Sequence, residues 1–289
     1  MPPKYGLTAG RFTLALGAKT LVMGIVNLTP DSFSKDGRLR VSHDPAAHAR
    51  FAGKLVREGA DIIDIGGQSS RPGAPRISAP EELKRILPFL RLFVPACQIP
   101  VSVDTFKPQV AAAALDAGAS IINNIMGTAP NKRLLLMARN YGAAIVLMHM
   151  RGSPCTMQSK TQYKDVVKDI IRELRASIEF CLEIGIKKDR IIIDPGIGFA
   201  KTAQQNLEIL NRLEELKLLC LPVLVGPSRK SFIGQVLNAN IDHRAWGTAA
   251  SIAVAITRGA DIVRAHDVRA MKQVAMMTDA IVHNLGAHL

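Results

Sequence analysis

The chain has 289 residues, of which 48% are hydrophobic and 21% charged, so it is long enough to bury a sizeable core. No apolar run reaches the length needed to cross a bilayer, which argues against a membrane protein. No Pro/Ser/Gly-rich linker and no block of like charge divides the chain. We therefore expect a single domain over residues 1–289, a length that one α/β barrel can use completely.

The formal net charge is +13, from 37 Lys and Arg against 24 Asp and Glu. A basic surface could bind nucleic acid or attract an anionic substrate. The basic residues are spread along the chain, and no recognition-helix, zinc-finger or RNA-binding aromatic motif appears. We therefore predict no nucleic-acid partner, and leave steering of an anionic substrate open.

Two further features indicate the cellular compartment of the protein. The first ten residues lack the apolar core of a signal peptide. The four cysteines have neither a CxxC pair nor a His at metal-ligand spacing; they are Cys97, Cys155, Cys181 and Cys220. We expect reduced packing thiols in a cytoplasmic protein.

Eight short β-type runs recur along the chain, and each supplies a polar residue or a glycine at its end. They are Leu21–Asn27, Asp61–Gly67, Val101–Thr105, Ser120–Asn124, Ala143–His149, Arg190–Gly196, Pro222–Lys230 and Ala260–Asp267. Stretches with helical periodicity alternate with them. These are Pro45–Gly59, Ala79–Val94, Pro108–Ala117, Tyr163–Gly185, Ala203–Leu219, Ala245–Gly259 and Val268–Leu285.

Apolar runs with little alternation suit parallel strands that are covered on both faces. The repeated strand-helix order predicts a (βα)8 TIM barrel, in which the active site lies at the carboxyl ends of the strands. Phe12–Thr20, within a 1–20 extension, reads as a β-hairpin that could plug the bottom of the barrel. An open Rossmann sheet is the alternative, but no GxGxxG follows a strand and opens a helix.

Two carboxylates and one amide stand at predicted strand ends: Asp104, Asp194 and Asn123. Each Asp by itself could be a helix cap or a turn residue. Together in an apolar cup they would bind a flat heterocycle rich in N–H donors, because carboxylates accept from amino and ring N–H groups and an amide both donates and accepts.

Later strand ends carry groups suited to anions. Gly226–Ser231 lies where a strand should pass into a helix, and Lys230 and Arg229 add charge there. An exposed basic turn, or a Schiff base at Lys230, are the alternatives. Arg264 and His266 point to the same side of a strand and could clamp pyrophosphate, or form an ion-paired rim.

Other residues suggest a metal and a closing loop. Asn27 ends the first strand and could face a Mg²⁺ held mainly by phosphate oxygens and water. The segments 27–38 and 68–75 are rich in turn formers, and loops of this kind after barrel strands commonly close over substrates. Simple connections are the alternative interpretation.

At this point the residues resemble a known family, the dihydropteroate synthases of folate biosynthesis, which sulfonamides inhibit. The resemblance runs from about Leu21 to Val268. It rests on MGIVNLTPDSFS, DIGGQSSRPGA, SVDT, IINN, LMHM, DPGIGF, GPSRKSFIG, WGTAA and HDV, in that order. It implies a barrel that joins 6-hydroxymethyl-7,8-dihydropterin pyrophosphate to p-aminobenzoate, releases pyrophosphate with the help of Mg²⁺, and forms a homodimer through its later helices.

The resemblance also assigns roles to residues of this chain. The pterin-binding group comprises Asp104, Asn123, Met148, Asp194 and Lys230. Pyrophosphate would contact Asn27, Arg71, Arg264 and His266, with Asn27 also facing the metal. The p-aminobenzoate pocket comprises Phe33, Ser70, Arg71, Pro72, Phe199, Lys230 and Ser231. The implied catalytic set is Asp104, Asp194, Lys230, Arg264 and His266.

Several positions depart from the family pattern. They are Lys35 and Asp36 in the first loop, Gln68 and Ser70 in the second, Asn124 beside the pterin amide, and Ile197. A lysine near a forming cation is electrostatically unfavourable, so loop ordering and sulfonamide sensitivity stay open. Two other functions remain as alternatives: a methyltetrahydrofolate:corrinoid methyltransferase, and a non-catalytic pterin or nucleic-acid binder.

Overall fold

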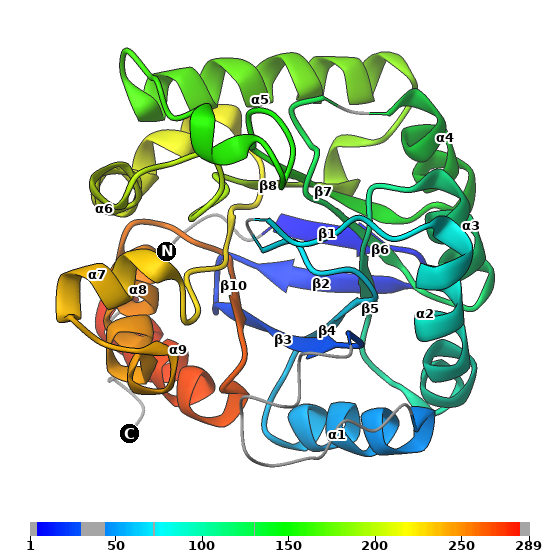
Figure 1. Cartoon of the computed structure of the whole chain (residues 1–289). Helices are drawn as coiled ribbons and strands as arrows, with labels where there is room; N and C mark the ends of the chain where they lie inside the picture. The colour runs from blue at the N-terminus through cyan, green and yellow to red at the C-terminus, as the bar shows by residue number, and fades with distance from the viewer. Residues whose placement is uncertain (1–4, 30–43, 72, 130, 284–289) are drawn as a thin grey trace.

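The computed structural model describes residues 5–29, 44–71, 73–129 and 131–283. An N-terminal pair of strands precedes an eight-stranded parallel sheet that is wrapped by helices (Figure 1). The strands are β1 (Tyr5–Ala9), β2 (Phe12–Leu16), β3 (Leu21–Asn27), β4 (Ile62–Gly66), β5 (Val101–Asp104), β6 (Ile121–Asn124), β7 (Ala144–Met148), β8 (Ile191–Asp194), β9 (Leu224–Val225) and β10 (Ile262–Ala265).

The α-helices alternate with these strands. They are α1 (Pro45–Arg57), α2 (Ala79–Phe93), α3 (Pro108–Asp116), α4 (Lys132–Tyr141), α5 (Val166–Glu183), α6 (Ala203–Asn211), α7 (Ser231–Leu237), α8 (Ala245–Thr257) and α9 (Val268–Val282). Short 3₁₀ helices cover Val94–Ala96, Met157–Ser159, Lys188–Arg190, Leu213–Leu219 and Ile241–His243.

The sheet closes into a ring, as the (βα)8 prediction required. The strand order is β8-β7-β6-β5-β4-β3-β10-β9, and every pair in it is parallel. A parallel bridge between Ile193 and Val223 joins β8 to the residues just before β9, and the Ile193 N–H donates to Pro222 O at 2.9 Å. The carboxyl ends of all eight strands therefore meet at one mouth.

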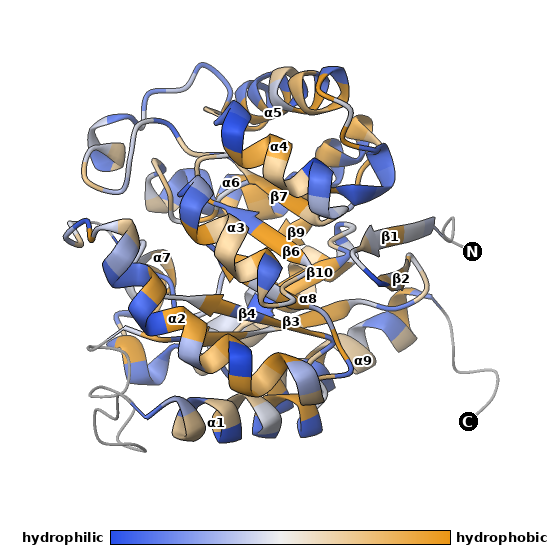
Figure 2. Cartoon of the chain, turned by 90° about the vertical axis from the view of Figure 1, so that its right-hand side faces the viewer, coloured by the Kyte–Doolittle hydropathy of each residue, from blue (hydrophilic) through white to orange (hydrophobic). Residues whose placement is uncertain are grey.

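The strands are apolar throughout because both of their faces are buried. One face, with Val22, Ile63 and Ile145 among its residues, packs against the helices. The other face points into the barrel, where Met23, Ile62 and similar side chains fill the lumen. Figure 2 shows the result: the strands are mostly hydrophobic, whereas the surrounding helices carry hydrophobic and hydrophilic residues together. The barrel is a packed core and not a pore.

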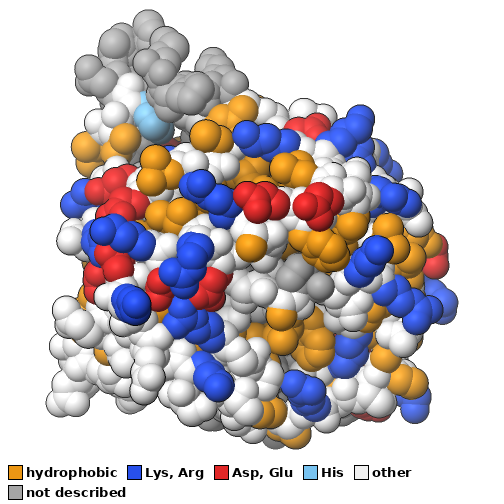
Figure 3. All heavy atoms as spheres, turned by 90° about the horizontal axis from the view of Figure 1, so that it is seen from above, with side chains coloured by type: hydrophobic (Ala, Val, Ile, Leu, Met, Phe, Trp, Pro, Cys, Tyr) orange, Lys and Arg blue, Asp and Glu red, His pale blue; other side chains and the backbone are white. Residues whose placement is uncertain are grey.

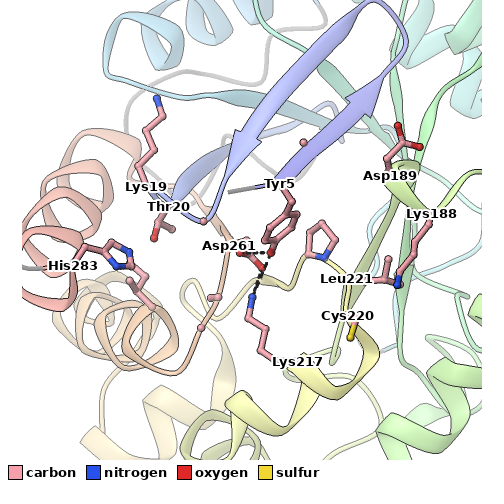
Figure 4. A pocket seen from close by; sticks show the side chains of 16 residues that line it. Tyr5, Lys19, Thr20, Lys188, Asp189, Lys217, Cys220, Leu221, Asp261 and His283 are labelled. Carbon is pink, nitrogen blue, oxygen red and sulfur yellow. Dashed lines mark hydrogen bonds and ion pairs between the residues drawn. The ribbon is translucent and has the colours of Figure 1, made fainter. Parts of the chain in front are cut away.

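The predicted hairpin at the barrel bottom is confirmed, but it spans Tyr5–Leu16, and the predicted segment Phe12–Thr20 supplies only its second strand. β1 and β2 pair antiparallel, and Leu7, Ala9 and Leu16 are buried together with the lumen side chains of the barrel strands. The start of the hairpin is anchored by Asp261, which accepts from Tyr5 Oη and Lys217 Nζ, each at 2.6 Å (Figure 4). These residues line a cavity of about 730 Å³ between the hairpin and the barrel.

The helix predictions need two corrections. α4 was not predicted, because its short apolar stripe (Leu134, Leu135, Ala138) is flanked by many polar residues. The expected helix Ala203–Leu219 is divided into α6 and the 3₁₀ helix Leu213–Leu219. The buried face of α6 carries Asn206, Ile209 and Leu210, and Leu207 is 38% exposed.

The cysteines are free thiols, and Cys97 and Cys181 pack in the core as predicted. Cys155 and Cys220 are exposed, so the packing prediction is wrong for these two. No helix in the described ranges combines the length and hydropathy needed to cross a bilayer. Over the face seen in Figure 3, on the side that α5 covers, Lys and Arg are interspersed with Asp and Glu and form no continuous basic stripe.

The Asp261 anchor gives a prediction about stability. Asp261→Ala leaves the buried Val223 N–H and the partly buried Lys217 without their acceptor, so we expect the free energy of unfolding to fall by about 3 kcal/mol. Asp189→Ala is the control: exposed Asp189 accepts from Thr8 Oγ1 at the same end of the barrel, and its loss should cost less than about 1 kcal/mol. Urea unfolding measures both, and equal effects would contradict the anchoring role.

Candidate active site

The predicted site residues converge at the mouth of the barrel around Asp64, a residue that the sequence did not single out. Asp64 lies within β4 and is fully buried. It accepts hydrogen bonds from Ser102 Oγ at 2.6 Å, Asn123 Nδ2 at 3.2 Å and Arg264 Nε at 2.7 Å. The side chains of four strands are thereby joined, and the amide oxygen of Asn123 is oriented by the bond that its nitrogen makes.

Arg264 bridges Asp64 to a second carboxylate. Its Nη2 lies 3.5 Å from Asp104 Oδ2, at the end of β5. Burial, and then the charge of Asp64, raise the pKa of Asp104 to about 7, although Arg264 acts in the opposite direction. Arg264 therefore has two carboxylate partners within the site, in addition to any anion that it meets at the mouth.

Asp194 ends β8 and is 6% exposed. The Gly196 N–H donates to its Oδ1 at 2.7 Å. Burial raises the pKa of Asp194 to about 6, against the lowering influence of this hydrogen bond and of Lys230, Lys201 and Arg264. The carboxyl group thus titrates close to neutral pH and is sensitive to the cations around it.

Lys230 and Phe199 form a second side of the site. Lys230 Nζ lies 3.9 Å from the centroid of the Phe199 ring, a cation-π contact. Burial lowers the pKa of Lys230 to about 8. Phe199 packs in a small buried cluster with Met148, as expected for an apolar wall. A flat ring could lie against this wall while its edge meets the carboxylates.

His266 is held as a neutral ring. Its Nδ1 lies 3.0 Å from Ser228 Oγ, and the same hydroxyl accepts from the His266 N–H at 3.3 Å. Burial, followed by the charge of Arg264, lowers the pKa of His266 to about 3. The Ser228 hydroxyl can donate to Nδ1, and in that tautomer the imidazole carries its proton on Nε2 and can donate it to an anion.

The neighbouring Arg229 does not contribute its charge in the way the sequence suggested. Its Nη2 and Nε lie 2.8 and 3.1 Å from the carboxylate of Asp267, so it forms an ion pair beside the site. Its φ of 56° turns the chain sharply before Lys230 and α7. Ser231, the first residue of α7, is exposed.

The remaining predicted residues have different outcomes. Asn27 ends β3 and is half-buried, and its Oδ1 is close to Gly66. Arg71 is exposed and Ser70 is half-buried; the charge of Arg71 helps to lower the pKa of His266 and of Lys230, which places it on the same side of the barrel. Phe33, Lys35, Asp36 and Pro72 lie outside the described residues.

Two of the departures from the family pattern have structural consequences. Gln68 Oε1 accepts from Lys107 Nζ at 2.5 Å, and Lys107 also pairs with the buried Glu82. The Gln68 amide thus links the start of the segment 68–75 to α2 and α3. Because an amide is neutral, it adds no charge to the Lys107–Glu82 ion pair. Asn124 Oδ1 accepts from Met126 N–H at 3.0 Å, whereas its buried Nδ2 has no hydrogen-bond partner among the described residues.

Sequence reasoning missed Asp64, Ser228 and a buried pair, His149 and Lys201. A usable signal existed for Asp64, because a charged residue inside the apolar run DIIDIGG requires a buried partner. Ser228 lies in the motif GPSRKSFIG and Lys201 lies just after DPGIGF, but His266 and His149, with which they bond, come from other strands. Sequence spacing does not reveal such contacts.

Comparison with known proteins agrees with this geometry. A family model described as "Pterin binding enzyme" matches residues 23–266. The dihydropteroate synthase of Synechocystis sp. is 46% identical over 95% of this chain and 94% of its own, and that of Bacillus subtilis is 42% identical over 95% and 93%.

Solved structures give the same result. The dihydropteroate synthase of Yersinia pestis with a sulfonamide drug has a TM-score of 0.89 at 38% identity, covering 96% of this chain and 99% of its own. The Thermus thermophilus enzyme with 4-aminobenzoate has a TM-score of 0.84 at 35% identity, covering 96% and 100%. The Burkholderia cenocepacia enzyme with 7,8-dihydropteroate has 0.86 at 34%, covering 99% of each chain. The chain belongs to the dihydropteroate synthase family, transferases of folate biosynthesis that act on the pterin methylene group.

Proposed function

We propose that this chain condenses 6-hydroxymethyl-7,8-dihydropterin pyrophosphate with p-aminobenzoate to give 7,8-dihydropteroate and pyrophosphate. The observation that carries the proposal is the grouping of Asp104, Asn123 and Asp194 at one mouth, next to the Lys230–Phe199 wall. Related enzymes were solved with 4-aminobenzoate and with 7,8-dihydropteroate, which supports the same pair of reactants here.

The first group of residues is proposed to bind the polar edge of the pterin. Its amino and ring N–H groups would donate to Asp104 and Asp194, and Asn123 would complete the edge with its oriented amide. Burial removes water from both carboxyl groups and thereby raises their pKa. The N–H donors of a bound pterin would take the place of that water. Met148 would pack against the pterin ring from the apolar wall.

The leaving pyrophosphate is the second part. As the C–O bond to pyrophosphate breaks, a cation-like methylene carbon forms next to the electron-rich pterin ring. His266 would donate from Nε2, and Arg264 and Arg71 would supply positive charge to the departing oxygens. The ionised Asp194 would lie near the developing cation.

The p-aminobenzoate side is the third part. Phe199 and the methylene stem of Lys230 would contact the benzoate ring, and Ser231 would bind its carboxylate at the start of α7. Ser70 and Arg71 would complete this pocket; Phe33 and Pro72, which the family resemblance adds to it, lie outside the described residues. The amine nitrogen attacks the methylene carbon and then loses a proton; a weakly basic aniline needs little base assistance. Sulfonamides are expected to compete for the same pocket, as the Yersinia pestis complex suggests.

Magnesium is proposed as the cofactor. The described residues contain no cluster of three or more His, Cys, Asp or Glu that could hold a metal. The half-buried amide oxygen of Asn27, at a strand end, fits Mg²⁺ bound through one protein oxygen together with substrate phosphates and water. When bound, Mg²⁺ would neutralise charge on the leaving pyrophosphate.

The deciding experiment measures pyrophosphate release by the purified protein with the pterin pyrophosphate and Mg²⁺, with and without p-aminobenzoate. We expect release that requires p-aminobenzoate and falls when EDTA removes the metal. Methyl transfer from methyltetrahydrofolate to a corrinoid protein would support the alternative function. Well-folded protein that binds pterin but yields no product would contradict the proposal.

Asp194→Asn should weaken pterin binding and lower kcat/KM by at least about tenfold, or about 1.4 kcal/mol, because an amide presents one acceptor oxygen where the carboxylate has two. The fold should be retained, as circular dichroism would show. Asp189→Asn, exposed and at the opposite end of the barrel, is the matched control. Near-normal kinetics of Asp194→Asn would refute the assignment.

A homodimer is also proposed, through α7, α8 and α9. Trp246 on α8 is 86% exposed, and Met276, Met277 and Ile281 on the adjacent α9 are between 63% and 68% exposed. Val236 and Leu237 add apolar surface on α7. Exposed apolar residues gathered on three neighbouring helices suggest an interaction surface. A cytoplasmic location also stays a prediction.

The dimer is tested by sedimentation. Wild-type protein at micromolar concentration should sediment at twice the mass of one chain, and Trp246→Glu should shift it toward the monomer, because a charge would be buried at the interface. Leu218→Glu is the control, since Leu218 is 69% exposed on the 3₁₀ helix Leu213–Leu219, outside the apolar surface. A wild-type monomer, or equal behaviour of the two variants, would contradict the proposal.

A further inference from the structure

Behind Asp194 lies a buried lysine that the reaction scheme does not use. Lys201 is 4% exposed and lies near the end of the loop that connects β8 to α6. Its Nζ lies 2.9 Å from Phe199 O, 3.3 Å from His149 O and 3.1 Å from His149 Nδ1. All three partners are acceptors if the His149 ring carries its proton on Nε2.

The other ring nitrogen of His149 fixes that tautomer. His149 Nε2 lies 3.1 Å from Glu173 Oε2, and a carboxylate can only accept, so Nε2 carries the proton. Burial lowers the pKa of His149 to about 4, so the ring is neutral and Nδ1 is an acceptor. Burial acts to raise the pKa of Glu173, but the hydrogen bonds from His149 and Arg151 lower it to about 2.

Three acceptors around one amine favour the ammonium form of Lys201. A neutral amine has two N–H groups, so its lone pair would have to face one of these acceptors. Burial lowers the pKa of Lys201 to about 7, while the charges of Asp194 and Glu173 raise it. The two carbonyl oxygens, Phe199 O and His149 O, therefore stabilise the charged form of Lys201, which burial by itself disfavours.

The same contacts hold the loop on which Asp194 and Phe199 depend. A Cβ at Gly196 would lie 2.0 Å from His149 O, and Gly196 has φ of 70°, so only glycine lets this loop approach the end of β7. Lys201 then ties the carbonyl of Phe199 to the carbonyl of His149. The loop is fixed at both of its ends.

We propose that Lys201 is a positioning residue for pterin binding: a buried cation, oriented by the Glu173–His149 pair, that keeps Asp194 ionised and holds the loop between Asp194 and Phe199. This inference rests on the proposed pterin site at Asp194. Lys201 touches neither substrate in this arrangement and acts through Asp194.

Other charged groups also act on Asp194 and on Lys201, and a test must allow for them. Asp194 is influenced by Lys230 after β9 and Arg264 on β10, besides Lys201. Lys201 is influenced by Asp194 on β8, Glu173 on α5, Lys230, and Arg151 after β7. Lys230 and Arg264 are retained in a Lys201 variant, so the difference between variant and wild type reports the loss of Lys201 together with any change in the charge of Lys230 that this loss causes.

The test measures binding of 6-hydroxymethylpterin, which lacks the pyrophosphate, by calorimetry between about pH 6 and pH 9. In Lys201→Met the pKa of Asp194 should rise by about one to three units, because an opposite charge has been removed. Because the pKa of Lys201 is about 7, the difference should be largest near pH 6: for a two-unit rise of the Asp194 pKa from about 6, affinity should fall more than tenfold there, fall less at pH 7, and recover to within about twofold at pH 9. The ratio of variant to wild type cancels any titration of the ligand.

Lys201→Gln separates charge from hydrogen bonding, because a neutral amide can still donate to the two carbonyls. The proposal expects the same pH-dependent loss as in Lys201→Met. Full affinity at pH 7 in Lys201→Gln, or a loss in Lys201→Met that is equal at all pH values, would reduce Lys201 to a structural role and overturn the proposal. Lys272→Met is the matched control, since Lys272 pairs with Asp61 at the opposite end of the barrel.

Asp194→Asn in the same assay separates a failure of the proposed pterin site from a failure of the proposed role of Lys201. Unchanged affinity in Asp194→Asn would show that the pterin site itself is misassigned. A loss in Asp194→Asn combined with a pH-independent effect of Lys201→Met would leave the site in place and refute the role of Lys201.

Discussion

Three carboxylates at the mouth of the barrel constrain the whole site: Asp64 and Asp194 are buried, and Asp104 is largely so. A carboxylate removed from water needs a cation or N–H donors close to it. Arg264 serves Asp64 and Asp104, and Gly196 N–H serves Asp194. Lys230 and Lys201 add positive charge from two further segments. The site is thus a balanced group of ionised side chains, in which changing one member alters the charge of the others.

This balance decides which groups are available to substrates. Asp64 is occupied by three donors from within the protein and acts as a fixed centre. Asp104 and Asp194 have fewer donors and titrate near neutrality, and these are the carboxyl groups to which the proposed pterin would donate. His266 stays neutral because burial, and then the charges of the cations around it, lower its pKa, so it adds no further charge to the group.

The contacts at the opposite end of the barrel stabilise the fold. There the hairpin β1–β2 covers the lumen side chains, and Asp261 links Tyr5 and Lys217 beneath it. These contacts involve none of the proposed substrate groups. Stability and chemistry are therefore placed at opposite ends of the same strands, as is general for (βα)8 barrels.

The sequence by itself determined the barrel, the hairpin and most of the strand ends, because strands buried on both faces must be apolar throughout and their polar terminators stand out. It also determined the family, through ordered motifs that include Asp104, Asn123, Asp194 and Lys230. It could not predict α4, whose helical stripe is too short, nor the break after α6, where local periodicity continues but tertiary packing does not. Only the tertiary structure decided the partners of the site residues. Asp64 with Arg264, Ser228 with His266, and Lys201 with His149 are each separated by 38 or more positions in the chain, and such pairs exist only once the ring of strands has closed.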